Sequence, residues 1–167
     1  PKNAIGEKPI QIIKIIDDDN NPFIQTRNLI IVENNAQLQI IDCDDSIKEQ
    51  SSFVNSYTEI FVGENAQLEN YKLQNLNDNS SLLNTNTAKQ LANSRLQTHT
   101  ISFNGGKIRN NIHVDIDGEG SECNLYGLYL VDKSQNVDNQ VKVNHNVANC
   151  NSNEKFKGIL DNEATAV

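Results

Sequence analysis

The sequence contains no methionine and no tryptophan, and it has only three prolines, three cysteines and three histidines in 167 residues. Aromatic residues make up 5% of the chain, which argues against the long aromatic groove of sugar-processing enzymes. The cysteines, Cys43, Cys123 and Cys150, are odd in number and far apart, so we expect no disulfide framework and a reducing compartment. The missing methionine and the start at Pro1 indicate a fragment of a longer chain.

Positive charge and long apolar runs are also scarce. The 14 Lys and Arg residues face 22 Asp and Glu residues, for a formal net charge of −8, so no general cationic surface exists for nucleic acid. No stretch reaches the roughly 18 apolar residues of a membrane span, and no basic segment followed by an apolar one opens the chain. We therefore predict a soluble, cytoplasmic protein with no nucleic-acid or membrane partner.

What the sequence does contain is a repeated segment. IIVENNAQLQI begins at Ile30 and IFVGENAQLEN at Ile60, an offset of 30 positions. GEGSECNL, from Gly118, aligns with GENAQLEN, from Gly63, at an offset of 55 positions (118 − 63). DNEATAV, from Asp161, aligns with the same segment at an offset of 98 (161 − 63). In each copy an apolar-polar run meets a short turn and then a small residue; these small residues are Ala36, Ala66, Ser121 and Ala164.

Alternation of apolar and polar residues, as in Ile112-Val114-Ile116, has the two-residue period of strands with one buried face. Asn accounts for roughly one residue in six and tolerates the left-handed conformation of tight turns. A β-sandwich would explain strands and turns but not a phrase that recurs in register, whereas a parallel β-helix explains both. We therefore predict an all-β, irregular parallel β-helix, with a loop at Asn75 to Thr87 and one helical turn at Thr87 to Ala92.

The whole chain, 1–167, is expected to form a single β-helix core domain. Within it, residues 1–26 are expected to form an N-terminal rung or cap that ends in the acidic turn Asp17-Asp18-Asp19, interpreted as a solvated turn rather than a cation site. The chain stops at Val167 inside an apparent strand, which again indicates a fragment.

Few residues suggest a catalytic or metal-binding role. His99 and His113 lie in alternating segments and are interpreted as packed or surface residues, although a β-helix could bring them together across rungs. His145 and Cys150 are the one close His and Cys pair, which is short of the three or four ligands of a stable metal site. We favour a packing role for this pair.

Acidic and glycine-rich segments are equally unspecific. Asp42, Asp44 and Asp45 around Cys43 are interpreted as turn residues. Gly118-x-Gly120 lacks the third glycine of a dinucleotide loop and opens no helix. No catalytic constellation is predicted.

Four ordered segments are more specific: RNNIHVDIDGEG from Arg109, NLYGLYL from Asn124, QNVDN from Gln135 and HNVANCNSNEKFKGIL from His145. In order and spacing they resemble the SufB/SufD family of iron-sulfur cluster assembly subunits, and SufD in particular. The matching positions are Arg109, Asn110, Gly118, Glu119, Gly120, Gln135, Val137, Asp138, His145, Ser152, Glu154, Lys157 and Gly158.

This resemblance implies a right-handed parallel β-helix in a non-enzymatic scaffold subunit that pairs with a SufB-like paralogue and a SufC-like ATPase. It also implies further rungs and a C-terminal helical region that this sequence does not include. The iron-sulfur cluster and ATP would belong to the complex, and no catalytic, cofactor-binding or metal-binding residue is assigned to this chain. The motif positions themselves are interpreted as structural. A homodimer, a polysaccharide lyase or hydrolase built on a β-helix, and a purely structural β-helix remain alternatives.

Overall fold

The computed structural model describes all 167 residues, and every regular element in it is a β-strand. The strands are β1 (Ile10–Ile16), β2 (Phe23–Val32), β3 (Gln37–Ser46), β4 (Phe53–Val62), β5 (Gln67–Asn75), β6 (Ser81–Gln90), β7 (Arg95–Asn104), β8 (Lys107–Ile116), β9 (Glu122–Val131), β10 (Asn136–His145), β11 (Asn151–Leu160) and β12 (Thr165–Ala166). There is no helix that could cross a membrane.

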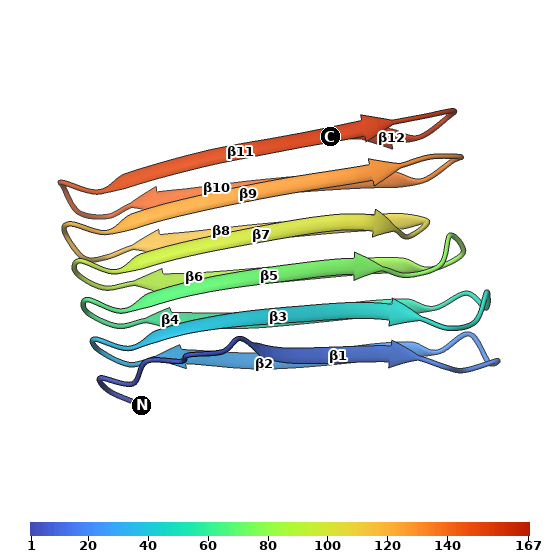
Figure 1. Cartoon of the computed structure of the whole chain (residues 1–167). Coiled ribbons are helices and arrows are strands. Elements are labelled where there is room, and N and C mark those ends of the chain that lie inside the picture. Colours follow the sequence, from blue (N-terminus) through green and yellow to red (C-terminus); the bar gives the residue numbers. More distant parts are fainter.

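The strands form two parallel six-stranded sheets, ordered β1-β3-β5-β7-β9-β11 and β12-β10-β8-β6-β4-β2. We call these the odd and the even sheet. Figure 1 shows the chain running along the odd sheet in front, returning along the even sheet behind, and climbing by one strand on each circuit. That path is right-handed, as parallel crossovers nearly always are. The predicted right-handed parallel β-helix is confirmed.

Each circuit, or rung, contains 26 to 30 residues, and this variation explains the unequal repeat offsets. Gln67 pairs with Gln37 below it, a step of 30 residues, and with Arg95 above it, a step of 28. Arg95 pairs with Glu122 after 27 more, so the offset of 55 spans two rungs. The offset of 98 has another origin, because residues 161–164 join β11 to β12 and therefore lie at the opposite edge of the β-helix.

The even-to-odd corners, where an even strand passes to an odd strand, repeat one backbone conformation. Asn35, Asn65, Asn93 and Asn149 all have φ between 56° and 61°, and Gly120 takes the same place with φ 74°. Asn tolerates this left-handed conformation better than other residues with a side chain. The Nδ2 group of Asn65 donates to Oδ1 of Asn35 over 3.1 Å. The high Asn content therefore has a structural cause.

The odd-to-even corners are irregular and account for much of the variation in rung length. They comprise residues 17–22, 47–52, 76–80, 105–106, 132–135 and 161–164. The shortest, Gly105-Gly106, requires glycine, because Gly105 has φ 140° and a Cβ on Gly106 would overlap the carbonyl oxygen of Asp78.

The interior is divided into three stripes. Along β5 the inward side chains are Leu68, then Asn70, Lys72 and Gln74, and Leu76 follows just after the strand. Leu68 belongs to an apolar cluster of 14 buried residues near the even-to-odd corners, and Leu76 to a second cluster of 6 near the opposite corners. The inward polar residues between them form what we call the polar belt: Lys14, Thr26, Asn28, Asp42, Asp44, Ser56, Thr58, Asn70, Lys72, Gln74, Asn84, Thr98, Thr100, Ser102, Asn110 and Asn139.

Two local predictions about the segment around β6 were wrong. Thr87 to Gln90 belong to β6, and Leu91 and Ala92 to a corner, so no helical turn forms there. The stretch Asn75 to Thr87 is a loop only at residues 76–80. Its polar side chains suggested a loop because the core of this β-helix itself contains a polar stripe.

The aspartates around Cys43 were also misassigned. Asp42, Asp44 and Asp45 all lie within β3, and Asp42 and Asp44 point inward and are 7% and 3% exposed. Isolated buried charges are so costly that sequence reasoning places them in turns, and only paired cations make this burial feasible.

Residues 1–26 contain β1 and the first four residues of β2. β1 pairs in parallel with β3, and β2 with β4. The acidic residues Asp17 and Asp19 lie at the corner between β1 and β2, where each forms an ion pair with Lys48, at 3.1 and 2.8 Å.

Candidate interaction surfaces

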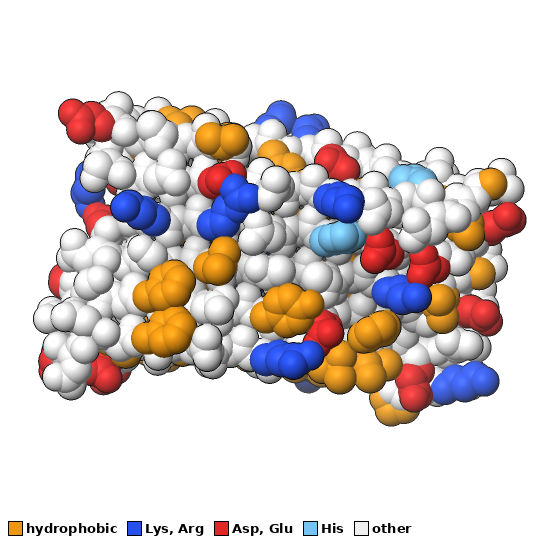
Figure 2. All heavy atoms as spheres, turned by 180° about the vertical axis from the view of Figure 1, so that it is seen from behind, with side chains coloured by type: hydrophobic (Ala, Val, Ile, Leu, Met, Phe, Trp, Pro, Cys, Tyr) orange, Lys and Arg blue, Asp and Glu red, His pale blue; other side chains and the backbone are white.

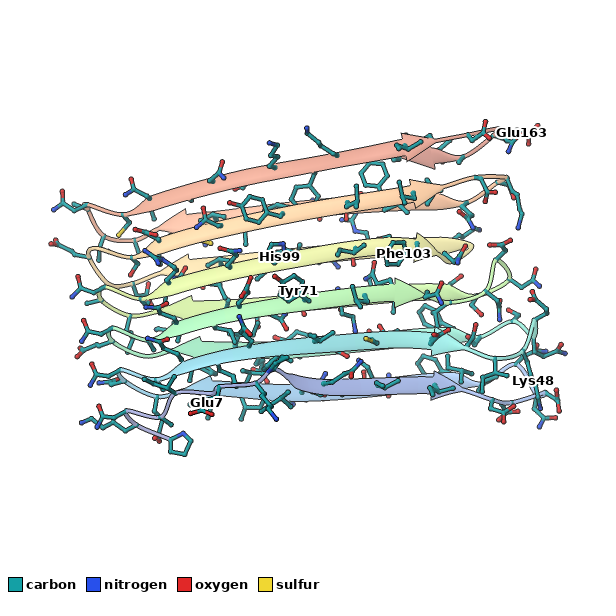
Figure 3. The ribbon with its side chains drawn as sticks, in the orientation of Figure 1. Glu7, Lys48, Tyr71, His99, Phe103 and Glu163 are labelled. Carbon is teal, nitrogen blue, oxygen red and sulfur yellow. The ribbon has the colours of Figure 1, made fainter.

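The outer face of the odd sheet has an aromatic row at its centre. Parallel register places Tyr71, His99 and Tyr126 on consecutive strands. The rings of Tyr71 and His99 stack at 4.3 Å between centroids with 6° between their planes, and His99 contacts Tyr126 at 5.2 Å. Figure 3 shows Tyr71 and His99 one above the other on the near sheet. Their faces are covered by one another, so the row presents ring edges to a partner.

Glu69 anchors this row. The Tyr71 hydroxyl donates a hydrogen bond of 2.6 Å to Oε1 of Glu69, which raises the pKa of Tyr71. Burial lowers the pKa of His99, and this effect exceeds the attraction of Glu69 at 3.6 Å. His99 is therefore expected to be neutral at pH 7, and the row carries no positive charge.

An apolar row runs beside the aromatic one. Ile13, Cys43, Leu73, Ile101 and Leu128 occupy paired positions on β1, β3, β5, β7 and β9. Ile13 is 56% exposed and Leu128 is 40% exposed. Contiguous exposed apolar side chains are typical of surfaces that another polypeptide covers.

The even sheet differs between its lower and upper rungs. Phe23 of β2 stacks on Phe53 of β4 at 5.3 Å. At the other end of these strands a groove of about 480 Å³ is lined by Ile31, Phe61 and Leu91, among others. Figure 2 shows apolar side chains gathered over the lower part of this face, with charged and histidine side chains higher up. The lower rungs of the even sheet are therefore a second candidate contact surface.

The upper rungs of the even sheet carry polar networks instead. Arg109 of β8 forms an ion pair with Asp138 of β10 and also donates to Oδ1 of Asn111 over 2.8 Å. Nearby, Asn144 donates to Oδ1 of Asp115 over 2.7 Å, which together with His113 lowers the pKa of Asp115. These contacts join β8 to β10 across the outer surface.

The other predicted motif residues are dispersed over the interior, two corners, and the strands β10 and β11. Asn110 is fully buried in the polar belt, where its amide bonds with Gln74, Asn84 and Asn139 at 2.7 to 3.3 Å. Val137 is fully buried in the smaller apolar cluster. Neither faces a partner or a substrate.

Gly118, Glu119 and Gly120 form an even-to-odd corner. A Cβ on Gly118 would overlap the backbone nitrogen of Ala92 in the rung below, so only glycine permits this approach. Glu119 accepts a backbone hydrogen bond from Asn93 through its carbonyl oxygen, over 2.8 Å, and its side chain is exposed.

Gln135 holds an odd-to-even corner together. It is 2% exposed, accepts from the amide of Asp132 over 2.9 Å and donates to Oδ1 of Asp78 over 2.5 Å. Lys133 pairs with the same carboxylate and, with Gln135, lowers the pKa of Asp78. Asp78 thereby bridges the corner 76–80 to the corner 132–135.

The last predicted group lies on β10 and β11. Nε2 of His145 lies 2.9 Å from Oγ of Ser152, whereas Sγ of Cys150 lies 3.3 Å from the carbonyl oxygen of Gly118. Glu154, Lys157 and Gly158 lie on β11, which has β9 as its one sheet neighbour.

The predicted histidines and cysteines do not converge. His99 and His113 face outward from opposite sheets. Cys123 is buried, and burial raises its thiol pKa to about 12, so it is a thiol at neutral pH. No three His, Cys, Asp or Glu side chains lie close enough to hold a metal ion.

Sequence reasoning missed a cluster of four inward-facing charges, Lys14, Asp42, Asp44 and Lys72, which we call the charge quartet; Lys14 is the most exposed of the four, at 22%. Nζ of Lys72 lies 3.0 Å from Asp42 and 2.6 Å from Asp44, and Nζ of Lys14 lies 2.8 Å from both carboxylates. Burial lowers the pKa of Lys72 despite both aspartates, whereas for Lys14 their attraction outweighs burial and raises the pKa. The available signal was an acidic residue at alternate positions of a strand, with lysines one rung away.

Taken together, these features define a parallel β-helix protein with a mixed apolar and polar interior and two apolar outer surfaces. The chain belongs to the family described as SUF system FeS cluster assembly, SufBD core domain, whose sequence model matches residues 15–167. The resemblance seen in the motifs is thus confirmed.

Similar curated proteins agree with this family. An iron-sulfur cluster assembly SufBD family protein of Synechocystis is 27% identical over all of this chain and 39% of its own length. SufD of Escherichia coli is 23% identical over 96% of this chain and 38% of its own length, and SufD of Plasmodium falciparum is 25% identical over 89% and 10%. The chain is SufD-like and spans well under half the length of each of these relatives.

Proposed function

We propose that this chain is the β-helix core of a scaffold subunit in SUF-type iron-sulfur cluster assembly. The observation that carries the proposal is the family match over residues 15–167, reinforced by relatives named for this process. The family match favours this role over that of a polysaccharide lyase or hydrolase. The subunit is non-enzymatic and works in the cytoplasm.

Its partners are a SufB-like paralogue and a SufC-like ATPase, with the iron-sulfur cluster as the cargo of the complex. The odd and even sheets support this role physically, because each presents apolar side chains on a rigid face. ATP is bound by the ATPase and not by this chain.

The test is recovery of partners on the full-length natural protein from lysate, with mass spectrometry and with iron and sulfide analysis. We expect a SufB-like protein and a SufC-like ATPase to be recovered together. Their absence from a folded, abundant bait would contradict the proposal.

Two outer-face variants locate the contact. Ile101→Glu places a charge on the apolar row of the odd sheet, and Phe61→Glu places one in the groove of the even sheet. Both side chains point outward, so the fold is expected to persist. Loss of partner recovery with one variant, at unchanged thermal stability, assigns the docking face.

A further inference from the structure

Several oxygen atoms of the polar belt are buried but receive no hydrogen bond from the protein. They include Oγ1 of Thr26, Oγ of Ser56 and Oδ1 of Asn84 on the even sheet, and Oδ1 of Asn70 and Oγ1 of Thr98 on the odd sheet. Folded proteins nearly always supply buried polar atoms with a partner, from the protein or from ordered water. A group of such atoms in one stripe of the core therefore requires an explanation.

Strand spacing provides one. Thr26, Ser56 and Asn84 occupy paired positions on β2, β4 and β6. Neighbouring strands lie about 4.8 Å apart, which exceeds the roughly 3 Å of a direct hydrogen bond between two short side chains. One water molecule between two hydroxyls spans this separation.

Longer side chains in the same stripe reach a neighbouring strand directly through at least one atom, although Oδ1 of Asn84 and Oδ1 of Asn70 receive no hydrogen bond. Nδ2 of Asn84 donates to Oδ1 of Asn110 over 3.0 Å, and Oγ of Ser102 donates to Oε1 of Gln74 over 2.7 Å. Of the five unpartnered atoms named above, three belong to short hydroxyl side chains, as the spacing argument predicts, and two are the amide oxygens of Asn70 and Asn84.

The first rung provides room. A cavity of about 230 Å³ is lined by Thr26, Lys14 and Asp44, with apolar residues that include Val54 and Leu76. A water molecule occupies about 30 Å³ in the liquid and needs two to four polar partners. The cavity thus has the volume for several waters, and Thr26, one of its polar lining residues, is paired in register with Ser56 of the belt.

We propose that the polar belt is an internal water-binding site in which ordered waters bridge Thr26, Ser56 and Asn84 and reach the charge quartet from the cavity at the first rung. The site is independent of the scaffold function. Water beside Asp44 and Lys72 supplies hydrogen bonds that the ion pairs alone do not satisfy, which reduces the cost of burying four charges.

The sign of a stability change tests this proposal in the full-length protein. Thr26→Val and Ser56→Ala remove one unpartnered hydroxyl each at little change in shape. If the hydroxyls bind water, both variants lose hydrogen bonds and the denaturant midpoint falls. If the hydroxyls are dry, removing an unsatisfied group raises the midpoint.

Thr58→Val is the matched control, because Oγ1 of Thr58 already accepts a hydrogen bond of 3.3 Å from Nδ2 of Asn28. The denaturant midpoint of this variant should fall whether or not the belt holds water. Nuclear magnetic resonance of the unmodified protein gives a readout that needs no variant. Cross-relaxation between long-lived water and the Thr26 methyl group is expected. A rise of both midpoints, or no water contact at Thr26, would overturn the proposal.

Discussion

The charge quartet and the outer ion pair Arg109–Asp138 use the same chemistry in opposite surroundings. In the quartet, Asp44 and Lys72 side chains are both 3% exposed, whereas Arg109 and Asp138 are 36% and 30% exposed. Water and salt screen an exposed pair, and its net worth is small. A buried pair is costly to form and far more costly to break, because the remaining charge stays in the core.

The comparison shows that the residues that match a sequence motif are not the residues whose loss should cost the most stability. Arg109 and Asp138 stand out in the sequence because they match a family pattern. The charge quartet does not stand out in the sequence. Its residues nevertheless point into the interior, where substitutions are least tolerated. Three predictions test this contrast, from the largest expected effect to the smallest.

Removing one cation from the quartet should cost most. Lys72→Met keeps the length of the side chain but leaves two aspartates with one lysine, so we expect a loss of about 3–5 kcal/mol of unfolding free energy. Chemical denaturation measures this loss. The double variant Lys72→Met with Asp42→Asn restores charge balance and should recover part of the stability. A loss below about 1 kcal/mol for Lys72→Met would show that the quartet is as weak as a surface pair.

Substitutions at two motif glycines should differ in how much stability they cost, although the glycines are two positions apart. Gly118→Ala forces a Cβ into the backbone of Leu91 and Ala92, and overpacking of this kind costs about 1–3 kcal/mol. Gly120→Asn installs the residue that already adopts this conformation in other rungs, and its Cβ would meet only the side chain of Asn93. Thermal unfolding compares the two variants. Equal losses would contradict the stacking account of these corners.

Breaking the outer pair should have the smallest effect. Arg109→Ala is expected to change the unfolding free energy by at most about 1 kcal/mol, because both partners are partly hydrated. Raising the salt concentration should shrink the difference between wild type and variant. Asp138→Ala is the control and should behave alike. A loss of several kcal/mol would place Arg109 in a role beyond this ion pair.

The fold was predictable to a large extent. Two-residue alternation predicted strands, and the copies at Gly63 and Gly118 predicted stacked rungs, because they lie at equivalent corners two circuits apart. The copy at Asp161 was misleading, since the same turn chemistry also suits the opposite corner. Thr87 and its neighbours were misassigned because a polar segment resembles a loop when the core is assumed to be apolar.

The site was less predictable than the fold. Gly118 and Gly120 were singled out correctly as corner residues, but the aromatic row of Tyr71, His99 and Tyr126 was not foreseen. These side chains come from three strands that are neighbours only once the length of each rung is known.

The sequence by itself determined that this chain forms a β-helix and to which family it belongs, because alternation, turn residues and ordered motifs are local properties. Only the tertiary structure decided that Lys14, Asp42 and Lys72 meet in the core. Their contact depends on register between strands 28 to 30 residues apart, and a shift of one residue would turn every one of them outward.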